Sequence, residues 1–231
     1  ELDGKWLYTI YGQLDRSGRY LYDLMLVSSV DHGRTWEYVS TIASYHDVPP
    51  RADMPGGNLE GPDEASLCLL STGELVCVYR VGSGLPKWPY HISRSKDGGK
   101  TWSKPAIMCE GIGSVEPSLK RLATGTLALS GGRPGIHLWL TNDEGMATWH
   151  DVNIGAHHNA TCEADEKLQV TTPDSPAIGE YCVDSQSTCY TEICEIAPGR
   201  VLMVYDRSPF GWNQGPMESN ERSMVFEVEI A

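Results

Sequence analysis

Ionisable residues recur in this chain at fixed distances from three glycines. Nine residues before each glycine stands a glutamate or a tyrosine, and seven or eight residues after it stands an arginine or an aspartate. The three sets are Glu64, Gly73 and Arg80; Glu116, Gly125 and Arg133; and Tyr190, Gly199 and Asp206. Carboxylates transfer protons, a phenol can act as a nucleophile, and arginine binds carboxylates through paired hydrogen bonds. The spacing therefore predicts either a ligand site or a group of ion pairs that serve only one another.

Pairs of strands joined at these glycines would position the ionisable residues. Each glycine separates two apolar runs, and the second runs are residues 74–80, 126–130 and 200–206. A hairpin brings together the two strand ends opposite its turn, so the ionisable residues should gather on one rim. The neighbouring Asp63 belongs to this rim, as does Asp15 in an earlier loop. Charges at the ends of buried strands cost desolvation unless they serve a ligand or one another.

A second repeat reads Ser-x-Asp-x-Gly-x-Thr-Trp, at residues 29–36 and again at residues 95–102. A third copy at residues 141–149 carries one extra residue. Each copy follows a strand-like run, so it is expected to close a β-hairpin. In such a turn the Asp carboxylate accepts hydrogen bonds from backbone N–H groups, and the Gly supplies a positive φ. The Trp is expected to pack beneath the turn.

Together the two repeats predict a four-stranded antiparallel sheet, and radial packing of such sheets gives a β-propeller. The predicted fold class is all-β, with blades at about residues 1–45, 62–108, 114–154 and 188–231 of a single domain. Residues 155–187 show little strand pattern and are expected to form a loop or insertion. The first strand of the first blade is expected before residue 1, so the 231 residues are interpreted as an incomplete propeller.

Composition excludes several classes of partner. The formal net charge of −13 argues against nucleic acid, which requires clustered Lys and Arg, and no apolar run reaches membrane-spanning length. Of the seven cysteines, Cys68 and Cys77 are expected to be free core thiols, whereas the later four are compatible with one or two disulfides. The later four lack the paired spacing of a zinc site. Neither a metal nor a cofactor is therefore predicted.

The chain resembles the sialidase superfamily, whose members carry this turn, known as the Asp-box, on six-bladed propellers. The resemblance covers most of the sequence apart from residues 155–188. It implies a nucleophilic Tyr190, a general base Glu116 and a general acid Asp15. It also implies that Arg133 binds the substrate carboxylate, with Arg80, Glu64 and Asp63 on the same substrate-facing rim.

The function implied by this resemblance is that of a glycoside hydrolase, a retaining exo-glycosidase that removes a terminal sialic acid or related acidic sugar from glycans. The alternative is a non-catalytic Asp-box propeller that binds glycans or a protein partner. The family uses three arginines, of which only Arg133 is placed, and residues 150–189 contain no arginine. The protein is expected to be secreted, periplasmic or at the cell surface.

Overall fold

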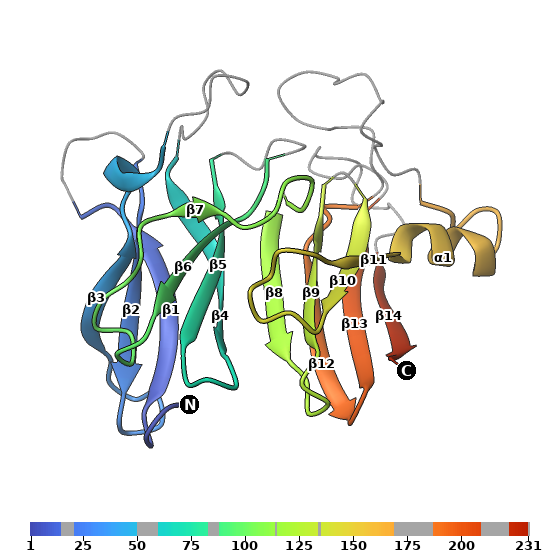
Figure 1. Ribbon diagram of the computed structural model, residues 1–231. Helices are drawn as coiled ribbons and strands as arrows, with labels where there is room; N and C mark the ends of the chain where they lie inside the picture. The colour runs from blue at the N-terminus through green and yellow to red at the C-terminus, as the bar shows by residue number, and fades with distance from the viewer. Residues whose placement is uncertain are drawn as a thin grey trace. The chain divides into compact units, whose positions relative to one another are not determined.

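The structure, a computed structural model, describes residues 1–14, 21–49, 60–82, 88–113, 115–133, 135–168, 187–208 and 222–230 (Figure 1). These residues form four antiparallel sheets. The chain divides into two compact units. The N-terminal unit comprises residues 1–83 and 90–110, and the C-terminal unit comprises residues 84–89 and 111–231.

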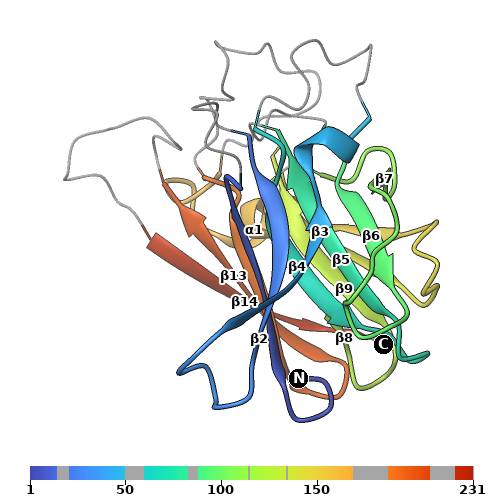
Figure 2. The same cartoon turned by 90° about the vertical axis from the view of Figure 1, so that its left-hand side faces the viewer.

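The N-terminal unit contains two sheets. The first has the order β1 (Trp6–Gly12), β2 (Asp23–Ser29) and β3 (Glu37–Ala43), followed in the chain by the 3₁₀ helix η1 (Tyr45–Asp47). The second has the order β4 (Pro62–Leu69), β5 (Leu75–Val81), β6 (His91–Ser95) and β7 (Ala106–Ile107). The two sheets pack together, with β1 and β2 against β4 (Figures 1 and 2).

The C-terminal unit also contains one four-stranded and one three-stranded sheet. Its first sheet has the order β8 (Val115–Arg121), β9 (Leu127–Gly132), β10 (Ile136–Thr141) and β11 (His150–Asn153). Its second sheet has the order β12 (Thr191–Ala197), β13 (Arg200–Arg207) and β14 (Arg222–Glu229). All of these strand pairs are antiparallel, as the two sequence repeats predict.

The second strand of each four-stranded sheet lies in the core. Every residue of β5 except Arg80 is buried, and every residue of β9 is buried. Strands buried on both faces are apolar throughout, and these two contain Leu, Val, Ala, Cys and Ser in place of alternating charges. In the N-terminal unit, Leu24, Leu26 and Tyr79 belong to the apolar cluster between the sheets. Ile193, Met203 and Tyr205 do so in the C-terminal unit.

The first two Asp-box turns form the expected hydrogen bonds. Asp31 accepts from the backbone N–H of Thr35 at 2.9 Å and from its hydroxyl at 2.7 Å. Asp97 accepts the same pair from Thr101, at 2.9 and 2.6 Å. These hydrogen bonds favour the ionised carboxylates and lower the pKa of both aspartates to about 2.

The tryptophans of the first two copies differ in burial. Trp102 packs against the apolar cluster of the N-terminal unit. Trp36 differs from the prediction, because it is 42% exposed and does not plug a buried gap. Its indole N–H donates to the Gly33 carbonyl of its own turn at 3.0 Å, so the ring braces the turn from the side. In the third copy Trp149 donates to the Met146 carbonyl at 3.1 Å. Met146 takes the positive φ that glycine has in the other two copies.

A short helix that the sequence does not predict, α1 (Ile154–Thr161), opens the expected insertion. Its buried His158 contacts the hydroxyl of Tyr205 at 2.7 Å and the carbonyl of Glu166 at 2.9 Å. These contacts tie the helix and the segment after it to β13. Residues 169–186 of the insertion lie outside the described residues.

All cysteines among the described residues are free thiols. They are Cys68, Cys77, Cys109, Cys162, Cys189 and Cys194. The disulfides considered for the late cysteines therefore do not form among Cys162, Cys189 and Cys194, and Cys182 lies outside the described residues. Within the described residues, no helix has the length and apolar character needed to cross a membrane.

Substitution of Gly99 by Ala should lower the free energy of unfolding of the N-terminal unit more than substitution of Gly73 by Ala does. Both glycines have a positive φ, of 87° and 82°, which costs an L-residue about 1–2 kcal/mol. A Cβ on Gly99 would also collide with the buried Leu26 side chain, whereas one on Gly73 would meet no atom within 4 Å. We expect the collision to add about 1–3 kcal/mol to the loss of unfolding free energy for Gly99→Ala. Urea unfolding of the two variants measures the difference, and equal losses would contradict this packing.

Candidate functional site

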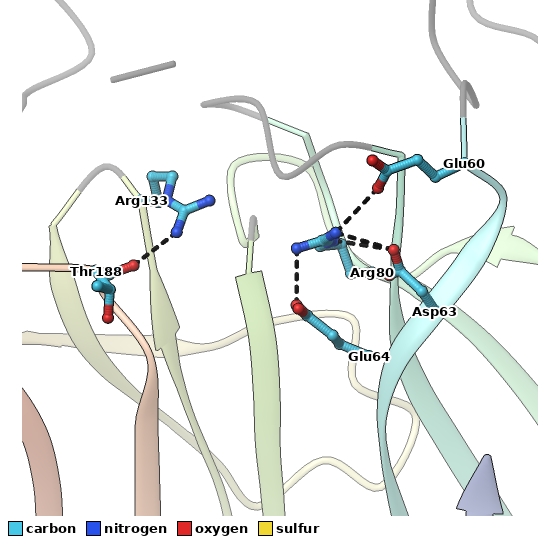
Figure 3. Close-up of polar contacts among 6 residues, drawn as sticks. All are labelled: Glu60, Asp63, Glu64, Arg80, Arg133 and Thr188. Atoms are coloured by element: carbon cyan, nitrogen blue, oxygen red, sulfur yellow. Dashed lines mark hydrogen bonds and ion pairs between the residues drawn. The ribbon is translucent and has the colours of Figure 1, made fainter. Parts of the chain in front are cut away.

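One cluster of ionisable side chains lies in the N-terminal unit, around Arg80 near the end of β5. Its guanidinium donates to Asp63 from Nε at 3.2 Å and from Nη2 at 3.0 Å. It also donates to Glu64 from Nη1 at 2.9 Å and to Glu60 from Nη2 at 3.1 Å (Figure 3). Asp63 and Glu64 lie near the start of β4, which pairs antiparallel with β5, so the ladder brings them to the same end as Arg80. Three carboxylates thus share one arginine.

The charge of this cluster depends on the buried carboxyl of Asp63, which is 1% exposed. Its Oδ2 accepts from Arg80, and its Oδ1 has no hydrogen-bond partner among the described residues. Burial raises the pKa of Asp63 to about 8, because it disfavours the ionised form more strongly than Arg80 favours it. The carboxyl therefore holds a proton at neutral pH. A protonated carboxyl also reduces the repulsion that three carboxylates around one cation would otherwise suffer.

An aromatic group extends this cluster. Tyr11, on β1, lies edge-on to Tyr22 with ring centroids 5.3 Å apart. Partial burial raises the pKa of Tyr11, and the charges of Glu64 and Asp63 raise it further. The phenol is therefore a neutral hydrogen-bonding group beside the carboxylates.

The other cluster lies in the C-terminal unit, where Arg133 directly follows β9 and Tyr190 directly precedes β12. The Cζ of Arg133 is 5.7 Å from the centroid of the Tyr190 ring, which is a cation–π distance. Its Nη2 donates to the carbonyl of Thr188 at 2.7 Å (Figure 3). The arginine thus contacts both the tyrosine and the backbone that leads to it.

The backbone on both sides of this contact is strained. Arg133 has φ +72°, and Cys189, the residue before Tyr190, has φ +63°. Positive φ is uncommon for residues other than glycine, and it is retained where the surrounding structure holds it. Such positions gather at functional sites, so the strain marks the Arg133–Tyr190 contact as a candidate site.

The neighbouring strand β8 places Glu116 at the same strand end as this contact. Ser118 of β8 donates to Glu192 of β12 at 2.6 Å, and the backbone N–H of Ala123 donates to Glu195 at 2.9 Å. The later residue on the β8 side contacts the later residue on the β12 side, so β8 and β12 run in the same direction. Glu116, the exposed second residue of β8, therefore stands at the same end as Tyr190.

The predicted site residues thus fall into two groups. The structure brings Asp63, Glu64 and Arg80 together in the N-terminal unit. In the C-terminal unit it brings Arg133 against Tyr190, with Glu116 at the same strand ends. Asp15 lies outside the described residues. No group of three His, Cys, Asp or Glu side chains among the described residues is arranged to hold a metal ion.

Three members of these clusters, Tyr11, Glu60 and Thr188, were not predicted from the sequence as site residues. Glu60 belongs to the acidic run at residues 60–64, and this run is the sequence signal for its place beside Arg80. Thr188 accepts a hydrogen bond from Arg133 through its backbone carbonyl. No sequence pattern signals such a backbone contact.

The free energy of unfolding should fall as the pH rises from 5 to 8, because the folded protein holds a proton on Asp63 that the unfolded chain has lost. This stabilisation is complete below the unfolded pKa of 3.8 and disappears as the pH passes about 8. One such proton gives a slope of at most about 1.4 kcal/mol per pH unit. Denaturant unfolding at several pH values should show the slope in the wild type and lose it in Asp63→Asn. The exposed Asp47 of the same unit gives the control Asp47→Asn, and an unchanged slope in Asp63→Asn would contradict the assignment.

Comparison with known structures shows the same fold. A protein of unknown function from Dyadobacter fermentans aligns with TM-score 0.66 and 21% identity, over 100% of this chain and 52% of that one. The Hadza microbial sialidase Hz136 aligns with TM-score 0.56 and 17% identity, over 91% and 34%. The NanB sialidase from Streptococcus pneumoniae aligns with TM-score 0.55 and 18% identity, over 91% and 29%. The chain thus spans about half of the first protein and about a third of each sialidase.

These identities are low, so the structural likeness establishes the fold alone. No curated protein matches the chain in sequence. Residues 5–161 match the BNR repeat-like domain family, which is more than half of the chain. The four antiparallel sheets are blades of a sialidase-like β-propeller, as predicted. The chain belongs to the BNR repeat-like domain family.

Proposed function

We propose that the protein is a retaining exo-glycosidase that hydrolyses a terminal sialic acid or a related acidic sugar from glycans. The observation that carries this proposal is the contact of Arg133 with Tyr190 at the start of β12. A phenol beside a nearly buried guanidinium joins a candidate nucleophile to a candidate carboxylate-binding group. The family membership supports the proposal, and sialidases are among the proteins that share this fold.

The choice of tyrosine fits the chemistry of such a sugar. Sialic acid carries a carboxylate on its anomeric carbon, so an Asp or Glu nucleophile would approach a like charge. A neutral phenol avoids this repulsion, and sialidases are the known exception that uses a Tyr nucleophile. In the proposed first step Glu116 accepts the phenol proton, and the Tyr190 oxygen bonds to the anomeric carbon. The bond to the leaving oxygen breaks as Asp15 protonates that oxygen.

Water then completes the proposed reaction. A water molecule gives a proton to Asp15, and its oxygen attacks the anomeric carbon on the face that the leaving group has vacated. The bond to Tyr190 breaks, and the phenolate recovers its proton from Glu116. Two displacements at the same carbon retain the anomeric configuration.

Two contacts of Arg133 support a role in recognising an acidic sugar. Its guanidinium is held at the rim by the Thr188 carbonyl, so little side-chain freedom remains to be lost when a carboxylate binds. Arginine binds carboxylates through charge-assisted hydrogen bonds, which are stronger than neutral ones. The Arg80 cluster has a different balance, since its guanidinium is bonded to three carboxylates. A substrate role for Arg80, Glu64 and Asp63 stays a prediction.

Substitution of Tyr190 by Phe should lower kcat by at least about 100-fold with little change in substrate affinity, because the lost oxygen forms the covalent bond. Release of a fluorogenic aglycone from a sialoside measures kcat, and calorimetry measures affinity. Tyr38→Phe is the matched control, since Tyr38 is exposed on β3 and should leave kcat unchanged. A wild type that binds acidic glycans but hydrolyses none, with Tyr190→Phe indistinguishable from it, would favour the non-catalytic propeller.

Substitution of Arg133 by Lys should raise KM for sialosides more than for neutral glycosides. Lysine keeps the positive charge but loses the planar fork that binds a carboxylate through two parallel hydrogen bonds. We expect a KM increase of about 10-fold, which corresponds to the loss of one charge-assisted hydrogen bond. Steady-state kinetics on a matched pair of acidic and neutral glycosides gives the comparison. Equal changes for both substrates would exclude carboxylate recognition by Arg133.

A further inference from the structure

We propose that Asp206 is a positioning residue for Tyr190, because it holds the turn from Ser187 to Cys189 that delivers the phenol to the rim. This inference rests on the proposed function for the role of Tyr190 as nucleophile. Asp206 lies near the end of β13. The residue before it, Tyr205, pairs with Thr191 of β12. Continuing this ladder places Asp206 beside Tyr190.

The carboxylate of Asp206 accepts hydrogen bonds from three donors of the turn. Its Oδ2 accepts from the backbone N–H of Thr188 at 2.9 Å. Its Oδ1 accepts from the Thr188 hydroxyl at 2.6 Å and from the Ser187 hydroxyl at 3.1 Å. A carboxylate is suited to this position because both oxygens accept and neither must donate. Three charge-assisted hydrogen bonds on two consecutive residues fix the turn to the end of β13.

The turn needs such restraint because it contains a strained residue. Cys189 has φ +63°, and its side chain is fully buried. The backbone N–H of Cys189 donates to the Ser187 hydroxyl at 2.9 Å, and that hydroxyl in turn donates to Asp206. A chain of hydrogen bonds therefore runs from the carboxylate to the residue before Tyr190. Without its anchor, the backbone would be free to leave this sparsely populated conformation.

Arg133 holds the same turn from its other side. Asp206 binds the N–H of Thr188, whereas Arg133 binds its carbonyl at 2.7 Å and lies over the Tyr190 ring. The two side chains thus clamp both backbone polar groups of one residue. Tyr190 follows two residues later, so a shift of the turn would move the phenol away from Arg133. A displacement of about 1 Å at a reacting group can cost on the order of 100-fold in rate.

The test compares Asp206→Ala and Asp206→Asn with the wild type. Asp206→Asn keeps the side-chain shape but retains only one acceptor oxygen, so its effect should be smaller than that of Asp206→Ala. The matched control is Asp151→Ala on β11, because Asp151 is an aspartate of the same unit whose carboxylate contacts His137. Two quantities are measured for each variant: hydrogen exchange of the peptide that covers residues 187–190, and kcat and KM for a fluorogenic sialoside.

We expect exchange at residues 187–190 to rise by about 10-fold to 100-fold in Asp206→Ala, the change that follows from losing charge-assisted hydrogen bonds. Exchange in β9 and β12 should stay unchanged. The kcat should fall by a similar factor, and KM should rise by a smaller factor, since Arg133 loses only the support of the Thr188 carbonyl and keeps its own place at the end of β9. A loss of folded protein would instead raise exchange throughout the unit, which separates positioning from general destabilisation.

Two results would overturn the inference. Unchanged exchange of the turn in Asp206→Ala would show that the carboxylate does not hold it. A loosened turn with unchanged kcat would show that the turn does not position Tyr190. If the wild type hydrolyses no acidic glycoside, the proposed function fails on its own, and the exchange data still decide whether Asp206 holds the turn.

Discussion

Burial of the second strand in each four-stranded sheet determines where charge can lie. β5 and β9 are enclosed on both faces, so a charged side chain within them would lose its hydration without compensation. Arg80 stands near the end of β5, and Arg133 comes immediately after β9. The antiparallel ladder then brings the start of the preceding strand to the same end, which places Asp63 and Glu64 beside Arg80. Concentration of ionisable groups at strand ends follows from burial of the strands themselves.

The two units use this constraint in different ways. In the N-terminal unit three carboxylates surround one arginine, and burial keeps a proton on Asp63. In the C-terminal unit the arginine stacks on a tyrosine and binds a backbone carbonyl, while an aspartate binds the adjacent backbone N–H. The first arrangement offers hydrogen-bond acceptors, whereas the second offers a cation and a phenol.

Features with a local cause could be predicted from the sequence. The hairpins, the Asp-box hydrogen bonds of Asp31 and Asp97, and the rim positions of Arg80 and Arg133 all follow from strand period and turn chemistry. Features that depend on side-chain networks could not be predicted. Tertiary contacts determine three such features: the exposure of Trp36, the hydrogen bonds between Asp206 and Thr188, and the formation of helix α1. The sequence of helix α1 has little amphipathic pattern from which a helix could be predicted. Its buried His158 is held by the hydroxyl of Tyr205 on β13.

The most direct test of the central claim is covalent capture of the nucleophile. A complex of Trypanosoma rangeli sialidase with 2,3-difluorosialic acid is described as a covalent intermediate, which makes this sugar the appropriate probe. The protein would be incubated with the probe, and intact mass and peptide mapping would then locate any adduct. We predict one added sugar per chain, on the Tyr190 oxygen, and none in Tyr190→Phe. No adduct on folded wild-type protein, or an adduct on another residue, would contradict the account.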